Sequence, residues 1–145
     1  MKELLQGIAQ KLYGCFGDGY EIYTDDVKQG LQEPCFFIAF LEPSWQRLPG
    51  RRWRLQNMWD ITYFPLREES TQEVLETAQR LMVEMEFITL PNGDLVHGID
   101  MRWQESDGVL HFFVSYPMTF REDSQLQAME ELQVEAATKE EKGGR

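Results

Sequence analysis

The sequence predicts an α+β fold: a mainly antiparallel sheet with two helices packed on one face, in the order α-β-β-β-α-(β-hairpin)-β-β. Three observations support this prediction. Two segments repeat apolar side chains with the period of a helix, several shorter segments alternate with the period of a strand, and the last two strands can be paired in one register. A chain of 145 residues is long enough for one core.

Residues 3–16 are the first predicted helix, because one apolar stripe recurs with helical spacing at Leu5, Ile8, Leu12 and Cys15 or Phe16. The glycines that follow are expected to end the helix. Tyr20–Thr24 then alternates between two faces, which predicts a short strand.

The segment Cys35–Leu41 is apolar on both of its faces. Such a strand is expected to be buried on both sides. Residues 43–50 are predicted to be a turn. The following segment, Trp53–Tyr63, is predicted to be one amphipathic strand, because large apolar residues alternate with polar ones.

Ser70 and Glu73 have the spacing of a capping box and predict a second helix that continues to about Glu86. Its apolar stripe is expected to pack on the sheet. The polar residues 91–94 then indicate a turn between Ile88 and Val96, and so a small hairpin.

The last two strands are predicted to pair around a two-residue turn at Asp107 and Gly108. This register segregates apolar from polar pairs. It places Trp103 opposite Phe112, Met101 opposite Val114, Ile99 opposite Tyr116, Gln104 opposite His111, and Asp100 opposite Ser115. Trp59 and Trp103 are both expected to face the core. Pro117 predicts an edge or a bulge in the final strand.

Two helices can cover only one face of the predicted sheet. Phe113 and one side of the Cys35–Leu41 strand then leave apolar groups on the other face. A partner or another copy of the chain is the expected cover. We therefore predict a homo-oligomer, and we assign its interface to Phe36, Ile38, Phe40 and Phe113.

The net charge of −11 argues against nucleic acid as the main partner, and no direct reading of nucleic acid is expected. No apolar run is long enough for a membrane span, and the first residues do not resemble a signal peptide, so a cytoplasmic protein is expected. Cys15 and Cys35 are predicted to be free thiols. Residues 1–121 are expected to form one domain, and residues 122–145 an acidic, partly disordered C-terminal tail.

The predicted turn is basic in an otherwise acidic chain. Tryptophan and arginine are favoured at protein interfaces. The sequence therefore indicates a partner interface at Trp45, Arg47, Arg51, Arg52 and Trp53. The alternative is an exposed hairpin whose charges only keep it soluble.

The sequence holds no recognisable catalytic, cofactor-binding or metal-binding motif. Asp18, Asp25 and Asp26 could at most contribute ligands to a cation site. The simpler interpretation is that they are solvent-exposed acidic residues in turns. His97 and His111 have no serine or cysteine partner that the sequence identifies. We expect a protein that is not an enzyme and that needs no cofactor.

Five short stretches resemble the opening of the phage tail terminator family of phages and prophages of Gram-positive bacteria. They are Phe16-Gly17, Tyr20-Glu21-Ile22-Tyr23, Asp26-Val27, Gln29-Gly30 and Pro34-Cys35-Phe36-Phe37-Ile38. Later pieces are similar in order and spacing, namely Asp60-Ile61, Tyr63-Phe64-Pro65, Ile88-Thr89-Leu90-Pro91 and Gly108-Val109-Leu110-His111-Phe112. The stretch Arg51-Arg52-Trp53-Arg54 departs from this pattern.

The resemblance implies a virion tail protein assembled in the cytoplasm of the bacterial host. It implies a ring, hexameric by expectation, on the end of the tail tube, which terminates tube polymerisation and offers a surface for head-tail joining. The implied partners are the chain itself, the tail tube protein and a head-tail connector protein. The alternative function is a small adaptor or interaction protein of phage or host that acts as a monomer or dimer.

Overall fold

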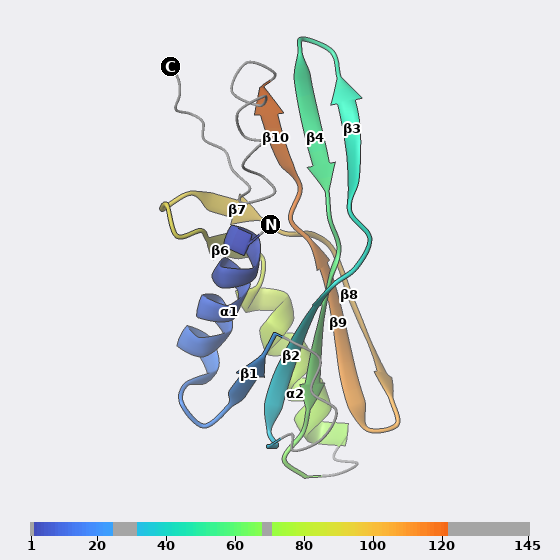
Figure 1. Ribbon diagram of the computed structural model, residues 1–145. Helices are drawn as coiled ribbons and strands as arrows, with labels where there is room; N and C mark the ends of the chain where they lie inside the picture. The colour runs from blue at the N-terminus through green and yellow to red at the C-terminus, as the bar shows by residue number, and fades with distance from the viewer. Residues whose placement is uncertain (1, 25–31, 68–70, 122–145) are drawn as a thin grey trace.

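The computed structural model describes residues 2–24, 32–67 and 71–121, and it confirms the α+β class. Figure 1 shows two parts: a sheet flanked by both helices, and a narrower sheet that projects beyond it. The elements are α1 (Lys2–Phe16), β1 (Glu21–Tyr23), β2 (Cys35–Phe40), β3 (Ser44–Leu48), β4 (Arg52–Gln56), β5 (Trp59–Phe64), α2 (Thr71–Glu84), β6 (Phe87–Thr89), β7 (Leu95–His97), β8 (Ile99–Ser106), β9 (Val109–Ser115) and β10 (Met118–Arg121).

The larger sheet has five strands in the order β1-β2-β5-β9-β8. Only the pair β1 and β2 is parallel, and the other neighbours are antiparallel. Both helices pack on one face of this sheet and form the core with it. The core residues come from α1 (Leu4, Ile8, Leu12), from α2 (Val74, Ala78, Leu81) and from the sheet (Phe36, Ile38, Ile61, Tyr63, Leu110, Phe112, Val114).

The first helix follows the predicted stripe, with one change at its start. Ile8 and Leu12 are buried as expected, but Leu4 takes the fully buried position and Leu5 is only half-buried. Gly7 lies on the same face. A Cβ atom there would come within 3.0 Å of the Thr89 carbonyl oxygen, so the helix and the β6–β7 hairpin approach each other at a residue without a side chain.

The chain between residues 43 and 64 differs from the prediction. The predicted turn contains the strand β3, and the single strand predicted for Trp53–Tyr63 is two strands, β4 and β5, in two different sheets. The second sheet has three strands in the order β10-β4-β3. Large apolar residues stand at odd-numbered positions both before and after the break at Asn57 and Met58. The alternation therefore continues across the break, and the sequence pattern does not reveal that one strand ends and another begins.

The predicted hairpin between β8 and β9 is confirmed near its turn. Asp107 and Gly108 both have positive φ angles, 54° and 78°, which a tight hairpin turn requires. The pairs Trp103 with Phe112 and Gln104 with His111 are also confirmed, although the Trp103 side chain is 37% exposed because β8 is an edge strand.

Beyond those pairs, an irregularity between Ile99 and Arg102 shifts the register. Ile99 pairs with Ser115, so the predicted pairs Ile99 with Tyr116 and Asp100 with Ser115 are wrong. Asp100 has a φ of 55°, which accompanies this bulge. Pro117 does mark a break: β9 ends before it, and β10 continues in the other sheet.

Other local predictions hold with small changes. The second helix ends at Glu84 rather than about Glu86, and Ile88 pairs with Val96 in a two-stranded sheet. Both cysteines are free thiols. No helix in the described part of the chain is long and apolar enough to cross a membrane.

Candidate assembly surfaces

The five-stranded sheet has an open face on the side opposite the helices. Strand pairing places two rows of side chains there: Ala39, Asp60, Phe113 and Arg102 in one row, and Phe37, Thr62, His111 and Gln104 in the next. Phe37, Ala39 and Phe113 are half-buried, and Arg102 is exposed. We call these eight residues the open face.

A small polar cluster lies at the centre of the open face. The Nδ1 atom of His111 is 3.2 Å from Asp60 Oδ2 and 3.3 Å from Thr62 Oγ1. The Thr62 hydroxyl also donates to Asp60 Oδ1 at 3.1 Å. These contacts satisfy the three side chains within the sheet.

Aromatic and cationic groups extend this cluster towards the sheet edge. The rings of His111 and Phe113 are stacked with centroids 6.4 Å apart, and the Arg102 guanidinium lies 4.8 Å from the centre of the Phe113 ring. The open face is therefore a mixed apolar and polar surface with Phe113 near its middle.

The predicted oligomer interface must be corrected at two positions. Phe36 and Ile38 are on the helix side of the sheet and are completely or almost completely buried in the core. Strand alternation places Phe37 and Ala39 on the open face instead. Phe40 is on the helix side too, but it lies at the end of β2, where 37% of it is exposed and its ring packs on Trp59. Of the four predicted residues, only Phe113 is on the open face.

The three-stranded sheet β10-β4-β3 projects beyond the five-stranded sheet and the helices (Figure 1), and we call it the arm. Its two faces differ in chemistry. One carries Trp45 and Arg47 from β3, Trp53 and Leu55 from β4, and Met118 and Phe120 from β10, and we call it the aromatic face. The opposite, arginine face carries Arg52, Arg54 and Arg121 with Gln46, Leu48 and Thr119.

The aromatic face is held together by ring contacts. The Arg47 guanidinium lies 4.9 Å from the centre of the Trp53 ring, and the rings of Trp45 and Phe120 are 5.8 Å apart. Leu55 and Phe120 are buried, whereas Trp45 is 37% exposed. Met118 packs against the main core, so this face continues the helix side of the molecule.

The arginine face concentrates positive charge. Arg52 and Arg121 are directly opposite each other, and Arg54 is two residues along β4 on the same face. Arg52 Nε donates to the Pro49 carbonyl at 3.1 Å, while Arg54 Nε is buried and has no hydrogen-bond partner. Like charges paired across strands destabilise a sheet. This face is therefore chemically suited to an acidic partner.

The structure brings the predicted partner residues together on the arm but divides them between its sides. Trp45, Arg47 and Trp53 are on the aromatic face, Arg52 is on the arginine face, and Arg51 is in the tight turn with a φ of 60°. Sequence reasoning missed Phe120 and Arg121, because their contribution depends on β10 pairing with β4. No local sequence pattern predicts the long-range pairing of β10 with β4.

The arm is attached where β4 leads into β5 and β9 leads into β10. The buried side chain of Asn57 spans these two strand breaks. Its Nδ2 donates to the Tyr116 carbonyl at 2.7 Å, and its Oδ1 accepts from the Tyr116 amide at 3.1 Å and from Trp59 Nε1 at 2.9 Å. We call this contact the junction.

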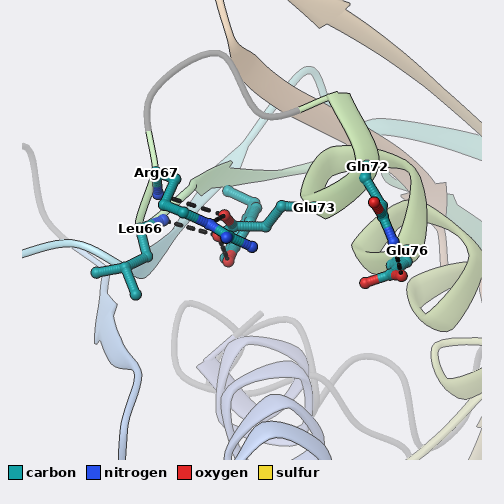
Figure 2. Close-up of polar contacts among 6 residues, drawn as sticks. Leu66, Arg67, Gln72, Glu73 and Glu76 are labelled. Atoms are coloured by element: carbon teal, nitrogen blue, oxygen red, sulfur yellow. Dashed lines mark hydrogen bonds and ion pairs between the residues drawn. The ribbon is translucent and has the colours of Figure 1, made fainter.

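A separate cavity of about 330 Å³ lies between the two helices, and residues on its wall include Phe16, Tyr20, Glu73 and Arg80. Figure 2 shows the Glu73 carboxylate turned towards Leu66 and Arg67, which precede α2. Glu73 accepts from the Tyr63 hydroxyl at 2.6 Å and from the Leu66 amide at 2.7 Å. Burial opposes ionisation, but these bonds and Arg67 outweigh it and lower the pKa of Glu73 below its ordinary value of 4.5.

The cavity thus has a structural carboxylate on its wall. No group of three metal-ligating side chains is present among residues 2–24, 32–67 and 71–121. Asp25 and Asp26, named above for a cation site, and Ser70 of the capping box lie outside the described residues.

The chain was compared with models of protein families. Residues 3–128 match a family model described as phage tail terminator protein. The match spans most of the chain, including both helices, the five-stranded sheet and the arm. No curated protein sequence matches the chain significantly.

Proposed function

Because the chain belongs to the phage tail terminator family, and so to the structural proteins of the virion tail, we propose that it assembles as a hexameric ring. In this proposal the ring binds the end of the tail tube and stops tube polymerisation. Its other side offers the surface on which the head is joined. The host is a bacterium, in whose cytoplasm the tail is built.

The observation that carries the proposal is the open face. A sheet face that carries half-buried Phe37, Ala39 and Phe113 beside its polar cluster, with no covering helix among the described residues, favours contact with another subunit. A closed ring needs two different surfaces on each subunit that meet through one rotation. In this proposal the open face is one of these surfaces. Phe40, which is partly exposed at the end of β2 on the helix side, also contacts a neighbouring subunit.

The arm provides the contact with other tail proteins in this proposal. It projects from the subunit, and its arginines form the local basic surface of an acidic chain. Acidic loops of the tail tube protein or of the head-tail connector protein would complement it. Such charge pairing selects the partner and speeds association more than it adds affinity.

Native mass spectrometry of the purified chain tests the ring. We expect a hexamer for the natural sequence and subunits or dimers for Phe113→Lys, because a lysine at the centre of the interface would be desolvated without a partner. Gln79→Lys is the matched control, since it makes the same charge change on the exposed side of α2. Circular dichroism of both variants establishes that the fold is retained.

The same measurement decides between the ring and the adaptor. A natural chain that stays monomeric or dimeric at every concentration contradicts the ring and favours an adaptor that binds one partner. A hexamer that Phe113→Lys leaves intact contradicts the open face as the contact while retaining the ring.

A further inference from the structure

The aromatic face of the arm is the side of a three-stranded sheet that no described helix covers. Figure 1 shows α1 and α2 beside the five-stranded sheet and the arm extending past them. The 37% exposed side chain of Trp45 and the half-buried side chain of Trp53 nevertheless lie there, beside the buried ring of Phe120. A small sheet gains independent stability only when its apolar face packs against something.

The path of the chain after β10 indicates which segment covers the aromatic face. The last strand of the arm, β10, ends at Arg121, one residue after Phe120. Residues 122–145 therefore follow directly on the last strand of the arm. Fully extended at roughly 3.3 Å per residue, they reach about 80 Å, several times the length of an arm strand. They lie outside the described residues, but their starting point is fixed.

The sequence of residues 122–145 complements the aromatic face. Apolar residues recur every three positions at Leu126, Met129 and Leu132, a spacing that places them on one side of a helix. Between and after them are acidic residues, including Glu130, Glu131 and Glu135. The segment thus combines an apolar stripe with negative charge, and the aromatic face combines aromatic rings with the Arg47 guanidinium.

We propose that residues 122–145 fold back on the arm of the same chain and pack Leu126, Met129 and Leu132 on Trp45, Trp53 and Phe120. Their carboxylates lie at the rim of this contact, beside the basic turn that contains Arg51. The segment is already tethered to β10, so its local concentration at the arm is high and docking needs no second molecule. The arginine face, on the other side of the arm, stays open to partners.

Hydrogen exchange of the full-length chain, followed by mass spectrometry, tests the proposal. In the natural sequence, backbone amides of residues 126–132 are expected to exchange at least on the order of tenfold more slowly than in a free peptide of residues 122–145. In the triple variant Leu126→Asp, Met129→Asp, Leu132→Asp, this protection is lost. Peptides from β3 and β4 then exchange faster as well, whereas peptides from β5 and β9 are unchanged.

The triple variant Ser124→Asp, Gln127→Asp, Thr138→Asp is the matched control. It adds negative charge to the same segment at positions outside the apolar stripe, and it should leave the exchange of both segment and arm unchanged. The reciprocal variant Trp45→Ser changes only the arm. It should accelerate exchange of residues 126–132 on the order of tenfold, although none of those residues is altered.

Two results would overturn the inference. One is exchange of residues 126–132 in the natural chain at the rate of the free peptide. The other is protection that rises with protein concentration, because a contact within one chain does not depend on it. Neither result bears on ring formation, which native mass spectrometry measures separately.

Discussion

The side-chain amide of Asn57 makes two hydrogen bonds with the backbone of Tyr116, donating to its carbonyl at 2.7 Å and accepting from its amide at 3.1 Å. The two residues are far apart in sequence but lie where the strands pass from the five-stranded sheet into the arm. An asparagine side chain thus replaces the backbone pairing that both strands lose at their breaks. The direction of the arm depends on this junction.

Asn57→Ala is expected to lower the free energy of unfolding by about 3 kcal/mol, because it leaves the buried amide and carbonyl of Tyr116 without partners. Urea denaturation followed by circular dichroism measures this change. Gln56→Ala is the control. Gln56 is the last residue of β4, directly before Asn57, and its substitution should change the free energy of unfolding by less than about 0.5 kcal/mol. An equal effect of the two substitutions would contradict the role of Asn57.

Gly98→Ala is expected to destabilise the fold by about 2 kcal/mol through overpacking. A Cβ atom at this position would be 2.8 Å from Val114 Cγ2 and 2.9 Å from the Tyr116 ring. Gly14→Ala, in α1, meets no atom within 4 Å and replaces a weak helix former, so it should stabilise the chain by about 0.5 kcal/mol. Thermal melting of the two variants should therefore shift in opposite directions.

Glu73 is expected to make stability depend on acid pH. Its pKa is lower in the folded chain than its ordinary value of 4.5, so the unfolded chain binds the proton more tightly. Its stabilising contribution is complete above that ordinary value and is lost as the pH falls towards the lower, folded pKa. Denaturation between about pH 6 and pH 3 should show a smaller acid loss for Glu73→Gln than for the natural chain.

The control for this prediction keeps the carboxylate and removes one donor. Tyr63→Phe leaves the bonds from Leu66 and Arg67 to Glu73 but deletes the bond of 2.6 Å from the Tyr63 hydroxyl. The loss of stability that this variant shows on lowering the pH should lie between the losses of the natural chain and of Glu73→Gln. Identical pH profiles for all three proteins would show that Glu73 is not stabilised as an anion.

The double substitution Arg51→Glu with Arg52→Glu should leave the ring intact but abolish its capping activity. It reverses charge at the turn and on the arginine face, away from the open face where subunits are proposed to meet. Electron microscopy of phage particles should show tails of irregular, increased length. Lys2→Glu with Lys11→Glu applies the same charge change to α1 as a control. Tails of normal length in the arginine variant would contradict docking through this part of the arm.

The local patterns of the sequence predicted both helices, the doubly apolar strand and the turn at Asp107 and Gly108, because these features depend on spacing within a few residues. They also predicted the pair Trp103 with Phe112. The bulge near Asp100 was missed, because one extra residue in a strand changes the register without changing the composition of the segment.

The interface residues illustrate the same limit. The sequence indicated that β2 is apolar on two sides, but alternation alone does not say which side faces the helices. Phe36 and Ile38 are in the core, and Phe37 and Ala39 face outward, because pairing with β5 aligns Phe36 and Ile38 with Tyr63 and Ile61 under the helices. The arginine cluster was visible in the sequence, whereas its third member on the same face, Arg121, was not.

The α+β class, the free thiols, the basic segment around Arg51 and the resemblance to tail terminators could all be predicted before folding was considered, because each rests on local spacing or composition. That this segment belongs to a projecting arm with an aromatic face and an arginine face follows from long-range contacts. That division depends on β10 pairing with β4 and on Asn57 bonding to Tyr116. Both contacts join residues nearly sixty positions or more apart, and such contacts form only when the whole chain has folded.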